Sequence, residues 1–330
     1  MQRSMNPENP RTPLNPRNLF NLLWTASPPL TVAGLLMLAA LVVSVIGLAV
    51  DPRIITGAPA WLKPAKFAVS TAIYMLTLAW VLTFLPDWLR TRRVIGWLTA
   101  VVLTLEVAII DAQAWRGVTS HFNVGTTLDG ALFSIMGAAI VIQTLSSIAA
   151  AIALWRQTFQ DRAFGWALSL GMTMTIVGAS TGGLMTSPTA AQLEQARATG
   201  RIAVVGAHTV GAPDGGPGLP GTQWSVEHGD LRVAHFLGLH ALQLLPVVAL
   251  VLSRRRWADA VRVRLVLTAA ASHVSLFAIL LWQALRGQAL VNPDAATLAA
   301  LALWATLTAA AVWVVTRRRA AIPGQALVLS

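Results

Sequence analysis

Eight long runs of apolar residues constrain this chain more than any other feature. A helix that crosses the hydrocarbon core of a bilayer needs about 20 predominantly apolar residues, and each run reaches that length. Only 11% of the residues are charged, against roughly 25% in soluble domains, so a water-facing surface could not be covered. We therefore predict an all-α fold, a polytopic membrane helix bundle with eight transmembrane helices. The predicted helices are Leu30–Val50, Ala65–Leu85, Val94–Ala114, Ala131–Leu154, Phe164–Thr186, Val233–Leu252, Leu265–Leu285 and Ala296–Thr316.

The chain is expected to form a single transmembrane domain over residues 28–316, between polar tails at residues 1–27 and 317–330. The first tail is not followed by a short apolar core with a cleavage site, so no cleaved signal peptide is expected. One long loop, residues 187–232, separates the fifth and sixth helices. Its beginning is expected to be a short surface helix, which Ser187 caps and Gly200 ends.

Basic residues resist translocation across a membrane, so their distribution predicts orientation. Sixteen of the 24 lysine and arginine residues fall on the side of the two termini, including the runs RTRR, SRRR and TRRR. Both termini are therefore expected in the cytoplasm and the long loop on the outer side. This placement accounts for the net charge of +11 without a nucleic-acid partner. The Arg- and Ala-rich composition is typical of a bacterial protein, which predicts the plasma (inner) membrane.

Polar side chains that lipid excludes collect in the outer half of the predicted bundle. The third helix carries Glu106 and Asp111, the expected catalytic acids, because an ionisable group within the membrane is costly unless it faces a partner or a cavity. A hydrogen bond from Glu106 to a neighbouring helix is an equally open interpretation. The two lysines, Lys63 and Lys66, begin the second helix, and either could instead extend its ammonium to the interface. The expected ligand-binding residues are Lys66, Tyr74, Gln113, Arg116 and Gln243.

Three histidines near the outer side, His121, His235 and His240, could bind a transition metal. The last two are five residues apart, about 140° around a helix, so at most one faces the bundle axis if the helix is regular. Haem is the second possibility, with basic side chains near its propionates. Thiolate ligands are excluded because the chain has no cysteine. The remaining outer histidines, His208 and His228, are expected to be loop residues.

Four sequence strings carry a family resemblance: WLKPAKF (61–67), QAWRGVTSHFN (113–123), DGGPGLP (214–220) and GDLRVAHFLGLHALQ (229–243). Together they resemble an uncharacterised family of eight-helix bacterial integral membrane proteins, over residues 51–252. The resemblance implies the eight-helix fold and no particular activity. All four strings fall on the predicted outer side, which also favours a site there.

Three functions are compatible with these patterns, and the sequence leaves open whether the protein is an enzyme. The first is metal- or haem-dependent chemistry on a small or lipid-soluble substrate. The second is proton- or ion-coupled transport, in which Glu106, Gln143 and His273 would continue a path inward. The third is a structural or sensory module whose polar groups only join helices. The expected partners are the lipid bilayer and a small-molecule or lipid-soluble ligand.

Overall fold

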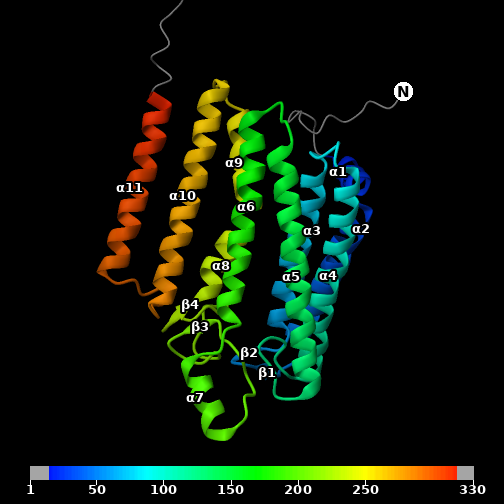
Figure 1. Cartoon of the computed structure of the whole chain (residues 1–330), viewed down its shortest axis with the longest axis vertical. Helices are drawn as coiled ribbons and strands as arrows, with labels where there is room; N and C mark the ends of the chain where they lie inside the picture. Colours follow the sequence, from blue (N-terminus) through cyan, green and yellow to red (C-terminus); the bar gives the residue numbers. More distant parts are fainter. Residues whose placement is uncertain (1–14, 318–330) are drawn as a thin grey trace, which may run out of the picture.

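The computed structural model describes residues 15–317, and most of them belong to helices that run side by side (Figure 1). Seven of the described helices are long and apolar enough to cross a membrane. They are α2 (Pro28–Val50), α3 (Leu62–Leu82), α4 (Leu89–Arg116), α5 (Thr127–Arg156), α6 (Arg162–Met185), α10 (Asp259–Leu285) and α11 (Ala295–Arg317). Two shorter helices, α8 (Leu231–Leu239) and α9 (Ala241–Ser253), pass the same test as a pair bent by 45°. The described residues thus form an all-α bundle with seven to eight candidate spans.

The helix ends differ from the predicted spans wherever a polar sequence continues the helix. The basic run at residues 90–93 is helical, so α4 begins at Leu89, and α10 begins at Asp259. Part of the predicted first tail is also helical: α1 (Pro16–Ala26) begins at the cap residue Asn15 and packs against α2 and α3. The rest of the two predicted tails, residues 1–14 and 318–330, lies outside the described residues.

The sixth predicted span is broken at His240. Asp230 caps α8, since its side chain accepts the backbone N–H of Arg232. The bend lies six residues before Pro246, which sits inside α9. At the break, Thr175 of α6 donates a hydrogen bond of 3.1 Å to the carbonyl oxygen of Leu239. A side chain of a neighbouring helix therefore satisfies a backbone group that the break leaves free.

One end of the bundle, here called the loop face, carries the long connection between α6 and α8 (Figure 1). A hairpin of β1 (Ile54–Ile55) and β2 (Ala58–Pro59) lies there, and β3 (Thr209–Val210) pairs antiparallel with β4 (Gly229–Asp230). The expected surface helix is α7 (Ala190–Thr199). It ends at Gly200, as expected, in a left-handed conformation. Thr189 caps it through a capping box with Gln192, so the predicted cap at Ser187 was wrong.

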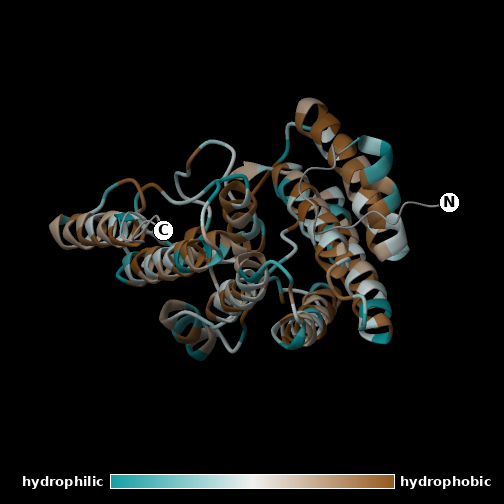
Figure 2. Cartoon of the chain, turned by 90° about the horizontal axis from the view of Figure 1, so that it is seen from above, coloured by the Kyte–Doolittle hydropathy of each residue, from teal (hydrophilic) through white to brown (hydrophobic). Residues whose placement is uncertain are grey.

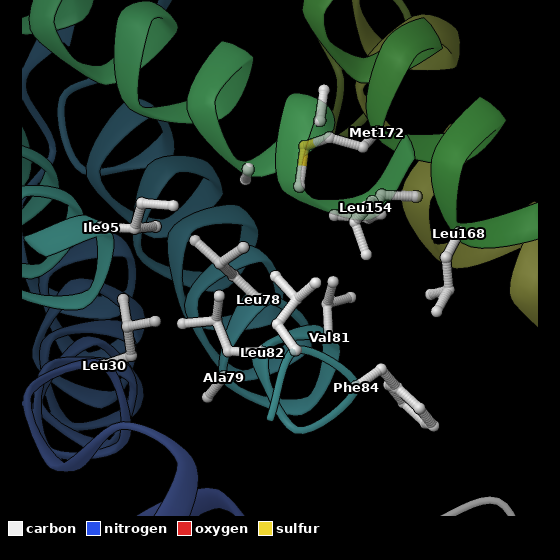
Figure 3. Packing of buried hydrophobic residues seen from close by; sticks show 14 of the residues in the cluster. Leu30, Leu78, Ala79, Val81, Leu82, Phe84, Ile95, Leu154, Leu168 and Met172 are labelled. Carbon is white, nitrogen blue, oxygen red and sulfur yellow. The ribbon is translucent and has the colours of Figure 1, made fainter. Parts of the chain in front are cut away.

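Apolar side chains fill the space between helices and also cover the outside of the bundle. Inside, Leu78 and Leu82 of α3 pack with Leu154 of α5 and Met172 of α6 (Figure 3). Outside, large hydrophobic residues are exposed on the spanning helices, among them Val42, Leu145 and Leu307, and hydrophobic residues make up much of the helix ribbons in Figure 2. The outermost helix, α11, buries only Thr297 among its described residues and packs against α10. Such a surface suits lipid, because soluble proteins rarely expose large continuous apolar patches.

Candidate functional site

Lys63, His121 and Glu106 meet near the loop face, and we call them the Lys–His–Glu cluster. Lys63 lies in the first turn of α3, Glu106 lies within α4, and His121 lies in the connection between α4 and α5. The Nδ1 atom of His121 is 3.0 Å from Lys63 Nζ. The other ring nitrogen, Nε2, is 3.4 Å from Glu106 Oε1. The imidazole therefore bridges an ammonium and a carboxylate that come from different helices.

The connection between α4 and α5 turns His121 back toward the helices. Gly117 ends α4 in a left-handed conformation, with φ 76°, which glycine adopts without strain. The chain then reverses, and Ser120 becomes buried with its Oγ atom 3.1 Å from His121 Nδ1. The imidazole lies between two phenylalanine rings, 5.6 Å from Phe67 and 6.1 Å from Phe122 by their centroids. These contacts fix the ring position.

The surroundings of His121 favour its neutral form. Burial, followed by the charges of Lys63 and His208, holds the pKa of His121 well below its usual range. A neutral imidazole accepts at one nitrogen and donates at the other, and an ammonium can only donate. Nδ1 therefore accepts from Lys63, and the ring proton lies on Nε2, which is 3.4 Å from Glu106 Oε1. The second carboxylate oxygen of Glu106, Oε2, is buried and has no hydrogen-bond partner among the described residues.

The loop over this face adds a second histidine–carboxylate pair. His208 Nδ1 is 2.7 Å from Asp214 Oδ2, and the same carboxylate accepts the backbone N–H groups of His208 and Thr209. Burial alone would raise the pKa of Asp214, but the hydrogen bonds and the charge of His208, with the bond from Thr209, hold it well below its usual range. The His208 ring also packs on Phe122 at 4.8 Å. His208 and Asp214 are loop residues, as expected, yet they belong to the surroundings of the cluster.

Two further cations anchor the same loop. Lys66 Nζ donates to the carbonyl oxygen of Thr222 at 2.8 Å. Arg232 forms an ion pair with Asp230 at 2.6 Å and also donates to the carbonyl oxygen of Gln223. A pocket of about 230 Å³ lies beside Arg232 and is otherwise lined by residues from the segments 209–216 and 223–228. Lys66 thus holds the loop, and its ammonium has a protein partner.

The other predicted catalytic acid, Asp111, stays apart from the cluster. It lies five residues beyond Glu106, which is about 140° around α4. One of its oxygens is buried, and its side chain forms no hydrogen bond or ion pair within residues 15–317. Arg116 and Gln113 also have their hydrogen-bond partner outside the cluster. Both bond to Asp129 of α5, at 2.7 and 2.9 Å, so they connect two helices.

The remaining predicted ligand-binding residues lie deeper in the bundle. Tyr74 is hydrogen-bonded to Ser147 at 3.1 Å and to Gln143 at 3.2 Å. It is eleven residues along α3 from Lys63, a rise of about 16 Å. Gln243 lies in the first turn of α9, and its carbonyl oxygen is buried without a partner in the described part of the chain. The five predicted ligand-binding residues therefore do not form one site.

The three histidines of the predicted metal site have separate partners. His121 belongs to the Lys–His–Glu cluster, and His240 packs on the ring of Phe236 at 4.2 Å. His235 Nδ1 donates to the carbonyl oxygen of Gly178 at 2.8 Å. Nowhere in residues 15–317 are three His, Asp or Glu side chains placed to hold a metal ion together. The structure therefore does not form the predicted site, and the basic residues expected near haem propionates are engaged by protein groups.

Lys63 is the residue of the cluster that sequence reasoning placed outside the site. Its signal was present in the string WLKPAKF, but a lysine at a helix end equally suits extension to the membrane interface. No protein-family model, no curated protein and no solved structure matches this chain. The resemblance to an eight-helix membrane family thus stays a prediction from the four sequence strings.

Proposed function

We propose that the protein carries out acid–base chemistry on a small or lipid-soluble substrate at the Lys–His–Glu cluster. The observation that supports this proposal is the placement of one imidazole between an ammonium and a buried carboxylate, at 3.0 and 3.4 Å. A group that passes protons to a substrate must lie close to its own proton source, and here one hydrogen bond of 3.0 Å and one contact of 3.4 Å provide that proximity. The bundle supplies a rigid frame for it.

The direction of proton movement follows from one hydrogen bond, from Lys63 to His121 Nδ1, and from the 3.4 Å contact between His121 Nε2 and Glu106. Lys63 gives a proton to Nδ1 of His121, while Nε2–H gives one to Glu106. The transfer replaces an ammonium and a carboxylate by an amine and a carboxylic acid. Burial favours neutral groups over charged ones, so the apolar rings beside His121 assist this step. After this transfer Lys63 carries a neutral amine at the loop face, and Glu106 is a protonated carboxylic acid.

The predicted metal ligands His121, His235 and His240 have separate partners, so their arrangement gives no support to a metal- or haem-dependent version of this chemistry. Proton-coupled transport is the second candidate, and one observation favours it. A deeper polar group at Tyr74 and Gln143 lies on the cytoplasmic side of the cluster in the predicted orientation, and the Gln143 carbonyl oxygen is buried without a partner in the described residues. The rise of about 16 Å along α3 between Lys63 and Tyr74 argues against it, because no chain of hydrogen bonds within residues 15–317 links the two groups.

The coupling within the cluster can be measured on the purified protein in detergent. Nitrogen-15 NMR of its six histidines reports the tautomer and titration of each ring. In Lys63→Met the pKa of His121 should rise, because a neighbouring positive charge is removed. In Glu106→Gln the preference for Nε2–H should weaken.

Asp111→Asn provides the matched control, since it changes a carboxylate on the same helix that has no contact with His121. A His121 spectrum that responds to all three substitutions alike would contradict the proposal. So would a His121 that titrates at its ordinary pKa in the unmodified protein. A structural role alone predicts lower thermal stability in each variant without a selective change at His121.

A further inference from the structure

The two lysines of the chain face different kinds of acceptor. Both lie in the first turns of α3, at the loop face. Lys66 donates to a backbone carbonyl oxygen, which cannot take up a proton at neutral pH. Lys63 donates to an imidazole nitrogen, which can. Of the two amines, only Lys63 has a route by which its proton can leave and free the nitrogen lone pair.

No carboxylate forms a direct ion pair with Lys63 among the described residues. Glu106 and Asp214 act on it from beyond contact, as do the positive charges of Lys66 and Arg232. Its ammonium is therefore not held by a salt bridge of the kind that keeps a surface lysine charged. An amine next to other cations and screened from water is a recurring form of activated nucleophile.

We propose that Lys63 is a nucleophile that forms an imine with a carbonyl substrate, an aldehyde or ketone with an apolar body. This inference rests on the proposed acid–base function of the same cluster. It adds the identity of the reacting atom, Lys63 Nζ, and the class of substrate. The cluster has the form nucleophile, base and orienting carboxylate, in which His121 is the base and Glu106 fixes its tautomer.

The steps balance with groups that the cluster contains. The proton of the Lys63 ammonium passes through His121 to Glu106, and the amine nitrogen then attacks the carbonyl carbon. A C–N bond forms as the C=O π pair moves to oxygen, which takes a proton from nitrogen by way of His121. Glu106 returns its proton to this hydroxyl, water leaves, and the nitrogen lone pair completes a protonated imine. One carbonyl is consumed, one water is released, and Glu106 ends as the carboxylate.

The neighbouring rings suit such a substrate. Lys63 Nζ lies 5.9 Å from the centroid of Phe67, and Phe122 borders His121 on its other side. Phe122 is buried, while the His121 side chain keeps 20% of its surface exposed, so the cluster is reachable but poorly hydrated. A site that limits water protects an imine from hydrolysis.

Reductive trapping tests the proposal directly. The full-length protein in detergent is incubated with hexanal and cyanoborohydride near pH 7, and alkylation of each lysine is followed by tandem mass spectrometry. Lys66 serves as an internal reference in every sample. We expect Lys63 to be modified at least tenfold faster than Lys66. The ratio should fall toward one in His121→Gln and in Glu106→Gln, while the Lys66 rate stays within twofold.

Equal rates at the two lysines, or a faster Lys66, would overturn the imine proposal. The proposal would also be overturned if Lys63 were still alkylated faster than Lys66 in both His121→Gln and Glu106→Gln. The exposure of Lys63 alone would then explain its reactivity. Size-exclusion profiles and thermal unfolding identify any variant that has lost its fold, and His121→Asn provides a second substitution. If the His121 NMR signals respond selectively to Lys63→Met and Glu106→Gln but Lys63 is not trapped, the acid–base function stands without the imine. If His121 shows no such selective response, both proposals fail.

Discussion

Asp214 holds together the turn at residues 208–214 in the loop over the site. Its carboxylate accepts the ring N–H of His208 and the backbone N–H groups of His208 and Thr209. All of these donors lie five or six residues earlier, so one carboxylate closes a compact turn. Hydrogen bonds to a charged acceptor are stronger than those to a neutral one, and the turn therefore depends on ionised Asp214.

The turn should consequently weaken in acid. The pKa of Asp214 in the folded protein lies below its unfolded value of about 4, so its contribution to stability is complete above that pH and is lost as the pH falls through the folded pKa. The hydrogen exchange of residues 205–216 can be measured and corrected for the intrinsic exchange rate at each pH. The corrected protection should be constant from pH 8 to 5 and should decline below a pH of about 4. Asp214→Asn should exchange roughly tenfold faster at pH 7. Glu194→Gln, an exposed carboxyl on α7, is the control, and equal protection in both variants would refute the assignment.

At the scale of elements, helices α6 and α8 cross closely at two glycines, Gly178 and Gly238. A Cβ atom on Gly178 would lie 2.5 Å from the carbonyl carbon of Gly238, and one on Gly238 would lie 2.4 Å from the Gly178 Cα. Backbones in membrane bundles approach this closely only where small residues meet. The crossing also brings the Gly178 carbonyl oxygen to His235.

Gly178→Ala should therefore destabilise the bundle. Its methyl group meets backbone atoms, which cannot rotate away, and overpacking of this kind costs about 1–3 kcal/mol. Gly183→Ala is the matched control on the same helix, because no atom lies within 4 Å of a Cβ there. That variant should be neutral or more stable by up to about 1 kcal/mol. Thermal unfolding followed by circular dichroism in detergent compares them, and two equal melting temperatures would count against the close crossing.

From hydropathy and residue spacing, the helices themselves could be predicted better than the contacts between them. The apolar runs located the spans because lipid imposes a length on them. The partner Gly238 and the break at His240 depend on how α6 lies against α8, which no single-helix pattern contains. The Lys–His–Glu cluster was missed for the same reason. It requires the turn after Gly117 that brings His121 back beside Glu106, and nothing in the string TSHFN specifies that turn.

At the scale of the whole molecule, the two ends of the bundle differ in chemistry. The loop face holds the Lys–His–Glu cluster under an ordered segment, and α7 projects from it (Figure 1). The opposite end carries the basic runs in the first turn of α4 and before α10, at residues 90–93 and 254–256. Basic runs favour the cytoplasmic side, so we infer that the loop face lies outside and that a substrate reaches Lys63 from outside or from the outer leaflet.

This orientation can be tested without background, because the chain has no cysteine of its own. Single cysteines replace Glu194 on α7 and Arg255 between α9 and α10, both of which are exposed. A membrane-impermeant maleimide added to intact cells should label Glu194→Cys, and should label Arg255→Cys only after the membrane is permeabilised. The reverse pattern would place the Lys–His–Glu cluster on the cytoplasmic side and would make its carbonyl substrate an intracellular one. Equal labelling of both in intact cells would contradict a membrane-spanning bundle altogether, because two ends separated by a bilayer cannot both meet a reagent that does not cross it.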